Sequence, residues 1–349
     1  MEIKMRLKIP SGLFWLSAML VITMQACSAN STPASSTSVP LSGTTQSSNQ
    51  VDSAPTPLPT SAIQQGNAPV NLPDKRDDHA SDINSFSAAA KKMAPPGSDV
   101  FVNDLYERPF NATTMDTYFP YIDIVDTQGY IDNTWGYATI TLSGVDANGH
   151  LPAKYGVELD LNKDGRGDWL VLVSNPSSTD WSTQGVQAWK DTNGDVGGMT
   201  PLVSDNSSSG NGYETLVFDQ GKGSDNPDGA WASLSSADNK TIQIAFKLSM
   251  IGNPKSYMMG AWAGTDLNPA MFDLNDHMTH VQAGDPDSNV QFYPIKALSE
   301  IDNTCRLAIG FDPTGKEPGL CPTFIKQHTK PGQPGQPMPP PSLTNRNGG

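Results

Sequence analysis

The segment Asp160-Leu-Asn-Lys-Asp-Gly-Arg-Gly-Asp168 constrains the fold of this chain more than any other part of it. Side chains that carry oxygen alternate along it, and Gly165 lies among them, where a residue without a β-carbon permits a sharp turn. The flanking residues 155–159 and 169–173 are rich in valine, leucine and aromatic side chains, which is typical of strands. The sequence therefore predicts a β-hairpin whose turn is a loop suited to binding calcium.

Further strand-like segments recur along the chain with turn residues between them. The clearest is 241–248, in which alternate apolar side chains share one face. Others are 137–142, 184–189, 213–218 and 257–262. No long amphipathic helix interrupts them, which argues against parallel βαβ units. We therefore expect an all-β fold, a single jelly-roll-like β-sandwich over residues 98–327.

The composition supports a turn-rich β fold. The 349 residues include 30 Asp but only 6 Glu, together with 31 Gly and 29 Pro. Asp, Gly and Pro favour turns and ion loops, whereas Glu favours helices. The formal net charge of −14 argues against nucleic acid and anionic membrane surfaces as direct partners, because their phosphates repel an acidic protein.

Residues 1–26 have the features of a secretion signal peptide. Three basic residues within the first eight precede the apolar run 13–22. This run is shorter than the apolar segment that a permanent transmembrane helix needs. The run leads into Met24-Gln-Ala-Cys27, which resembles the bacterial lipobox, although that motif prefers Leu where Met24 stands. The resemblance implies a lipidated Cys27 and an anchor on the outer face of a bacterial membrane or at the cell surface. The alternative is an ordinary secreted protein cleaved near Ala26.

The cysteine count agrees with a lipidated Cys27. The chain has three cysteines, and in an exported protein an odd number leaves one cysteine without a disulfide partner in the same chain. If Cys27 carries lipid, Cys305 and Cys321 can form a disulfide, which would stabilise the fold by roughly 3 kcal/mol.

The two ends of the chain have low-complexity composition. Ser, Thr, Pro, Gln and Ala dominate the first part of residues 27–97, which we expect to be a disordered stalk because it cannot bury enough apolar surface to offset its ordering entropy. A short helix is expected within this range, over 82–93, where apolar residues recur at helical spacing. The Pro- and Gly-rich residues 328–349 are expected to form a disordered tail.

If the loop binds calcium, its residues correspond to the first nine positions of an EF-hand loop. The five residues at odd-numbered positions are Asp160, Asn162, Asp164, Arg166 (through its carbonyl) and Asp168. An EF-hand needs a bidentate Glu at the twelfth position, but Val171 stands there and a strand follows in place of a helix. We therefore expect structural Ca²⁺ rather than a regulatory EF-hand. The alternative is a loop in which Asp, Asn and Gly only make a good turn.

A second loop repeats the Asp-x-Asn-x-Asp spacing with Asp191, Asn193 and Asp195. It lacks Gly at the sixth position and an acid at the ninth. We include these three residues as candidate calcium ligands.

The residues Glu158, Asp160 and Asn162 resemble the Glu-x-Asp-x-Glu signature of family 16 glycoside hydrolases, which are also β-sandwiches. The resemblance implies that Glu158 is the nucleophile. A retaining glycosidase also needs a second carboxyl group about 5 Å away, and Asn162 in that position cannot deliver a proton. A glycoside hydrolase is therefore an alternative function.

Other catalytic patterns give no support to an enzyme. His277 and His280 lack the Glu and the spacing of a zinc-protease helix. No nucleophile elbow, phosphate-binding loop or dinucleotide fingerprint is present. We assign no catalytic residue.

Tryptophans give candidate ligand-binding rings. Six of the seven fall within the expected domain, where most are expected to fill the core. Trp181 lies in the polar stretch Ser178-Thr-Asp-Trp-Ser-Thr-Gln, so it is the ring we expect to be exposed and able to stack on a sugar.

The order of elements over about sixty residues from Tyr121 resembles the DOMON-like and family 9 carbohydrate-binding sandwiches. The resemblance lies in a strand at 122–124, a strand at 137–142, and the hairpin around Asp160 to Asp168. It implies a binding module for polysaccharide at the cell surface. A purely structural envelope protein is a further alternative.

Overall fold

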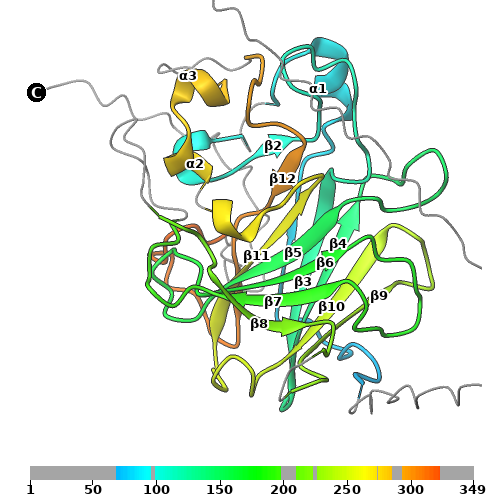
Figure 1. The fold of residues 1–349 in the computed structure, drawn as a ribbon, viewed down its shortest axis with the longest axis vertical. Coiled ribbons are helices and arrows are strands. Elements are labelled where there is room, and N and C mark those ends of the chain that lie inside the picture. Colours follow the sequence, from blue (N-terminus) through cyan, green and yellow to red (C-terminus); the bar gives the residue numbers. More distant parts are fainter. Residues whose placement is uncertain are drawn as a thin grey trace, which may run out of the picture. The chain divides into compact units, whose positions relative to one another are not determined.

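The computed structural model describes residues 68–95, 99–197, 210–222, 226–272, 274–284 and 293–322. Among these residues, thirteen strands form two antiparallel sheets, and the helices are few and short. This confirms the predicted all-β sandwich (Figure 1). Within the same residues, no helix is both long enough and apolar enough to span a bilayer. The signal peptide, Cys27, and the tail over 328–349 lie outside the described residues.

One sheet has five strands. Their spatial order is β1 (Asp78–Ser81), β3 (Ile124–Ile131), β4 (Trp135–Leu142), β10 (Thr241–Lys247) and β9 (Ala230–Leu234). Thr141 and Thr241 are partners in the β4–β10 register and share a hydroxyl hydrogen bond of 3.0 Å.

The larger sheet has eight strands. Their order is β2 (Glu107–Arg108), β12 (Ile301–Asn303), β11 (Tyr257–Gly264), β5 (Lys154–Asp160), β6 (Trp169–Ser174), β7 (Val186–Lys190) and β8 (Thr215–Asp219). The short strand β13 (Leu307–Ile309) also pairs with β11.

Two of the passages that the chain makes between the sheets lie at equivalent places. It leaves the five-stranded sheet after β4 and after β10, and it enters the larger sheet at β5 and at β11. Because β4 neighbours β10 and β5 neighbours β11, both crossings start from neighbouring strands of one sheet and end on neighbouring strands of the other.

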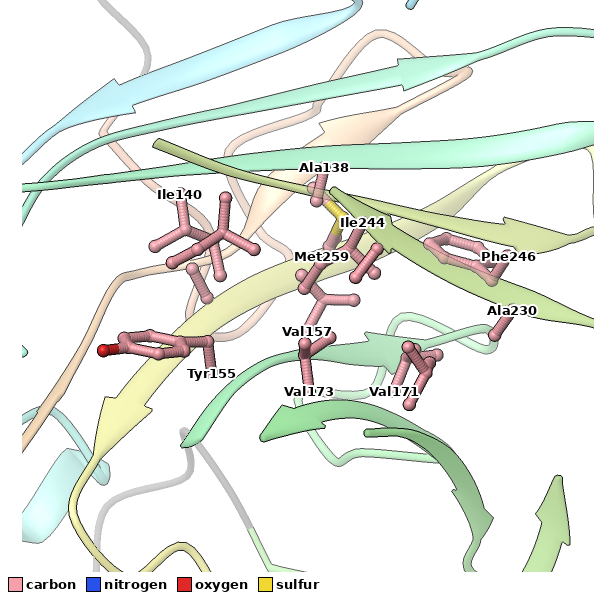
Figure 2. Close-up of a cluster of buried hydrophobic side chains, with 14 of the residues drawn as sticks. Ala138, Ile140, Tyr155, Val157, Val171, Val173, Ala230, Ile244, Phe246 and Met259 are labelled. Atoms are coloured by element: carbon pink, nitrogen blue, oxygen red, sulfur yellow. The ribbon is translucent and has the colours of Figure 1, made fainter. Parts of the chain in front are cut away.

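The main core lies between the two sheets (Figure 2). Alternate residues of β10 supply Ile242, Ile244 and Phe246, and β5 supplies Tyr155 and Val157 from the other side. All are buried, as the period-two patterns predict.

A second apolar cluster covers the outer face of the larger sheet. Leu170, Leu172 and Trp262 project from β6 and β11 into this cluster, together with Tyr213 and Phe272 from outside the sheet. The helical turns η1 (Phe101–Asn103), η2 (Pro269–Met271), α2 (Leu274–His277) and α3 (His280–Ala283) belong to or adjoin the segments that form it. Both faces of β5 and β6 are therefore buried.

The folded domain begins before residue 98, where we placed its boundary. Strand β1 pairs with β3, and the Ala308 N–H donates to Asp78 Oδ2 over 2.9 Å. Helix α1 (Phe86–Lys91) is shorter than the helix expected over 82–93. The boundary was missed because the strand sequence Asp-His-Ala-Ser is short and polar, so no apolar alternation marks it.

Candidate ion loops, a polar groove and a buried carboxylate cluster

The loop from Asp160 to Asp168 connects β5 and β6 as the predicted hairpin. Gly165 has a φ of 91°, so its left-handed backbone provides the sharp turn. Backbone N–H groups point inward at the side chains: Gly165 donates to Asp160 Oδ2 over 2.8 Å, and Leu161 donates to Asp168 Oδ2 over 2.7 Å. Asn162 and Asp164 cap further N–H groups and are exposed. The loop is therefore ordered by carboxylate and amide oxygens.

Arg306 compensates the first acid of this loop from a distant part of the chain. Its Nη1 lies 2.9 Å from Asp160 Oδ2, and its Nη2 lies 3.1 Å from Glu158 Oε2. All three side chains are at most 2% exposed. Burial raises the pKa of Asp160, and the Arg306 charge opposes that rise. Burial lowers the pKa of Arg306, but the two carboxylates outweigh it, so the net pKa is raised.

The second predicted loop lies beside the first. The Asp191 N–H donates to the Asp168 carbonyl over 3.1 Å, and Arg166 Nη1 donates to the Val196 carbonyl over 3.4 Å. Asp191 accepts N–H groups from Asn193, Gly194 and Val196, and Asn193 accepts one from Asp195. Burial raises the pKa of Asp168, and the charges of Asp164 and Asp191 add to the rise. The structure thus joins both loops at one end of the larger sheet.

The carboxylates of these loops are close but not gathered around one point. In the described part of the chain, one group of three acids has ligand atoms within 4.8 Å of one another, and it consists of Asp82, Glu107 and Asp302. Cation binding in the 160–168 loop would therefore need its carboxylate oxygens to close further, which two exposed side chains, Asn162 and Asp164, are free to do.

Glu158 is enclosed, which weighs against the glycoside hydrolase alternative. Its carboxylate accepts from Tyr213 Oη over 2.7 Å and from Trp262 Nε1 over 3.3 Å, in addition to the Arg306 ion pair. Its side chain is 2% exposed. A nucleophile needs access to the substrate, and this carboxylate instead anchors a buried polar network.

A polar groove lies at the opposite end of β6. Its volume is about 260 Å³, and it is bounded by the end of β6, the 175–185 loop, the end of β8 and β9. The lining contains no ionisable side chain, and its polar members include Ser174, Asn175, Ser178, Ser182, Gln184 and Gln220. The 175–185 loop reaches the other sheet, because Ser182 bridges Ala232. Sequence reasoning missed the groove, since its walls come together only when the sheets pack.

Trp181 is half-buried at the edge of this region. Its ring packs against the cluster of Trp135, Tyr137 and Trp231 on the five-stranded sheet. It precedes the groove residue Ser182, although it does not line the groove itself. The expected exposed ring is therefore partly covered.

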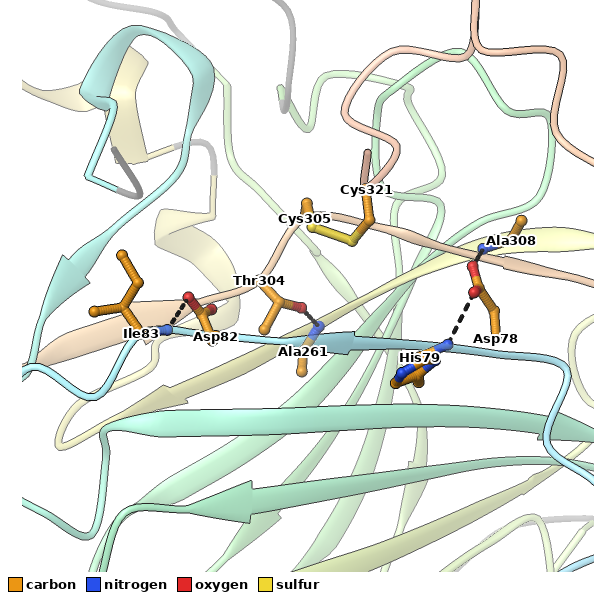
Figure 3. The surroundings of a disulfide bond; sticks show 9 residues. All are labelled: Asp78, His79, Asp82, Ile83, Ala261, Thr304, Cys305, Ala308 and Cys321. Atoms are coloured by element: carbon orange, nitrogen blue, oxygen red, sulfur yellow. Dashed lines mark hydrogen bonds between the residues drawn. A yellow bond between two sulfur atoms is a disulfide. The ribbon is translucent and has the colours of Figure 1, made fainter. Parts of the chain in front are cut away.

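A cluster of four acids lies where β1, β2, β3 and β12 come together. Asp82 follows β1, Glu107 belongs to β2, Asp123 precedes β3 and Asp302 belongs to β12. Figure 3 shows Asp82 just beyond β1, in the same view as the Cys305–Cys321 disulfide. Glu107, Asp123 and Asp302 are fully buried, and Asp82 is partly exposed.

Burial raises the pKa values of all four acids, and repulsion from neighbouring acids adds to the rise at Glu107, Asp123 and Asp302. Burial raises the pKa of Asp82 to about 6 and that of Asp123 to about 7. It raises the pKa values of Glu107 and Asp302 well above their usual range, and the Asp82 and Asp123 charges add to both rises. Two like charges 4.8 Å apart repel by roughly 3–4 kcal/mol at an effective dielectric constant of 20.

The predicted disulfide is confirmed. Cys305 and Cys321 are bonded over a sequence separation of 16 residues, with their Cα atoms 4.9 Å apart. Cys321 N–H donates to the Arg306 carbonyl over 2.8 Å, so the disulfide-closed segment also holds the backbone of Arg306.

No protein-family model, no curated protein and no solved structure matches this chain.

Proposed function

We propose that this protein is a lipid-anchored, extracytoplasmic binding module for carbohydrate, stabilised by calcium. The observation that carries the proposal is the groove at the end of β6, whose polar lining consists of hydroxyl and amide groups. Neutral groups of this kind suit a ligand rich in hydroxyls, because each can donate and accept hydrogen bonds without imposing a charge.

The chemistry of the groove favours binding over hydrolysis. A glycosidase needs two carboxyl groups on either side of the scissile bond. No carboxylate is among the groove's lining residues, and Glu158 lies in the buried network at the other end of the strands. The groove therefore has the means to hold a sugar but not to cleave it.

Two groove residues have a left-handed backbone conformation, which residues other than glycine seldom adopt. Asn175 has a φ of 48° and Gln220 a φ of 54°. Gln220 Oε1 also accepts the Gly185 N–H over 3.2 Å, so one wall is fixed by hydrogen bonding. Such strain collects at binding sites, where it fixes side chains before the ligand arrives.

Calcium has a supporting role in this proposal. The two ion loops lie at one end of β6 and the groove at the other, which the six residues of the strand separate by roughly 20 Å. Ca²⁺ bound at Asp160, Asn162, Asp164, Arg166 and Asp168, or at Asp191, Asn193 and Asp195, would not touch a sugar in the groove. It would stabilise the sheet that carries the groove.

The membrane anchor rests on Cys27. Because Cys305 and Cys321 are bonded to each other, Cys27 is the one cysteine of the chain outside that pair. Metabolic labelling with a fatty acid should tag the wild type but not Cys27→Ala. Equal labelling of both would remove the anchor from the proposal.

A glycan array in the presence of calcium tests the binding function. The wild type should bind a subset of glycans, and Gln184→Ala should lose that signal, because this exposed side chain lines the groove without internal hydrogen bonds. Asn175→Gly removes the amide while tolerating the left-handed backbone, so it should act in the same way.

The control is Asn148→Ala, which truncates an exposed amide outside the groove and should leave binding intact. Absence of binding to any glycan would favour the structural envelope alternative. Release of reducing sugar would revive the hydrolase.

A further inference from the structure

We propose that Asp82, Glu107 and Asp302, with Asp123 beside them, form a calcium site distinct from the two ion loops. The site joins the N-terminal strand β1 to β2 and β12 of the other sheet. Occupancy would fasten the first strand of the domain to the sandwich.

The geometry of the three carboxylates fits one calcium ion. One oxygen from each of Asp82, Glu107 and Asp302 lies within 4.8 Å of the others. Calcium binds oxygen at 2.3–2.6 Å, so two oxygens on the same ion can be at most about 5 Å apart. The three acids come from residues separated by most of the domain, yet they meet at one point.

The second observation is that two buried oxygens have no partner. Asp302 Oδ1 and Asp123 Oδ1 make no hydrogen bond, although both side chains are fully buried. The other oxygen of each is used: Asp302 Oδ2 accepts the Ile124 N–H over 2.6 Å, and Asp123 Oδ2 accepts the Ser85 N–H over 3.0 Å. Buried polar atoms are nearly always satisfied, so an orphaned carboxylate oxygen beside two other acids points to a cation.

The strand register makes the charge conflict unavoidable. Asp302 and Glu107 are direct partners in the antiparallel β12–β2 pair, which places their side chains on the same face. Like charges directly opposite in a sheet destabilise it. Repulsion at this position is therefore built into the fold unless something neutralises it.

Arginine neutralises three other buried acids of the protein. Arg306 pairs with Glu158 and Asp160, and Arg108 pairs with Asp99 at 2.8 Å. In the described residues, neither Asp302 nor Asp123 has an ion pair. The contrast with Asp99, Glu158 and Asp160 indicates that a bound cation takes the place that arginine fills at those three acids.

The donor set favours calcium over softer metals. The three converging residues offer carboxylate oxygen and no nitrogen or sulfur, which suits a hard cation. Asp82 is partly exposed, so the ion has a route from solvent and can keep water ligands on that side. Calcium accepts this irregular mixture of ligands more readily than magnesium, which needs near-octahedral geometry.

Calcium titration by calorimetry on the purified protein tests the site. The wild type should bind one Ca²⁺ per molecule more than Asp302→Asn, and Asp164→Asn, which alters the ion loop, should retain the site at this cluster. A second control is Asp104→Asn, which should also retain the site, because Asp104 is a buried acid outside the cluster. A folded Asp302→Asn with the wild-type number of bound ions would overturn the proposal.

Melting curves separate a cation from a cluster neutralised only by protons. In EDTA, Asp302→Asn should melt no lower than the wild type, because it removes one of several mutually repelling acids. In calcium it should melt lower, because it loses the ion. If the variant follows the wild type in both conditions, or gains stability in both, protons alone occupy the cluster and the proposal fails.

Asp82→Asn keeps the test valid if Asp302→Asn does not fold, because Asp82 is partly exposed and its loss perturbs packing less. Hydrogen exchange gives a local readout in this variant. Calcium should slow exchange of the Asp82 N–H, which donates to the Val125 carbonyl over 3.0 Å, in the wild type but not in Asp82→Asn. Equal slowing in both proteins would contradict the site.

Discussion

Arg306 and Asp160 form a buried ion pair across 146 residues of sequence, with Nη1 and Oδ2 2.9 Å apart. The pair connects the first residue of the predicted calcium loop to the segment that the disulfide closes. The same guanidinium reaches Glu158, so a single cation compensates two buried acids. The loop is therefore held from outside as well as by its own turn.

Replacing Arg306 with Met should destabilise the protein by about 3–5 kcal/mol, because Glu158 and Asp160 would remain buried without a counter-charge. Urea denaturation monitored by tryptophan fluorescence measures the loss. The control is Lys154→Met, which removes an ion pair with an Asp266 side chain that is 89% exposed, and it should change stability by less than about 1 kcal/mol. Equal losses in the two variants would contradict the buried network.

Removing the disulfide with Cys305→Ser and Cys321→Ser should lower the free energy of unfolding by roughly 3 kcal/mol, because a closed loop of this length restricts the unfolded chain. Urea curves of the wild type with and without reductant should differ by a similar amount. Cys27→Ser, outside this disulfide, should leave the curve unchanged. A reductant effect that persists in the double variant would point to another cause.

Gly165→Ala should destabilise the protein more than Gly194→Ala. Both glycines have positive φ, 91° and 73°, so alanine meets backbone strain at each. A β-carbon at Gly165 would also lie 2.6 Å from Pro318 Cβ, whereas at Gly194 nothing lies within 4 Å. The difference between their melting temperatures isolates the contact between the ion loop and the disulfide-closed segment. Equal melting temperatures of the two variants would mean that the ion loop does not pack closely against the disulfide-closed segment.

Stability without calcium should fall as the pH rises from about 4 to about 8. Burial raises the pKa of Asp104 to about 8; the Tyr106 hydrogen bond opposes that rise, and the Glu158 charge adds to it. A group whose pKa is raised in the folded state binds its proton more tightly there, so its contribution is complete below the unfolded pKa and is lost as the pH passes the folded value. Asp82 and Asp123 act in the same direction.

Asp104→Asn should make this decline shallower, because the amide does not titrate. Urea curves at a series of pH values in EDTA measure the slope. Glu317, a partly exposed acid whose pKa is lowered to about 2, acts below this window and serves as the control in the form Glu317→Gln. A slope unchanged by Asp104→Asn would contradict the assignment.

The strands with clear apolar alternation could be predicted from the sequence. The expected segments 137–142, 155–159, 169–173, 241–248 and 257–262 correspond to β4, β5, β6, β10 and β11. Their patterns carry information because each inward side chain reaches the core. The strands β1, β2 and β12 are short and largely polar, so they were missed.

The candidate sites also differ in whether the sequence could predict them. The hairpin loop at Asp160 could be found because its residues are consecutive, and its turn and capping side chains are present in the structure. The acids Asp82, Glu107 and Asp302 are scattered along the chain and have no spacing to detect. Arg306 was missed as the partner of Asp160 for the same reason, since only the sheet order brings them together.

The melting temperature in calcium compared with EDTA tests the calcium-stabilised account most directly. At about 100 times its dissociation constant, a single calcium ion adds about 2.7 kcal/mol, which corresponds to a rise of roughly 5–10 °C for a domain of this size. We expect a rise at least this large in the wild type and a smaller one in Asp164→Asn. Superimposed wild-type curves in saturating calcium and in EDTA would contradict the account.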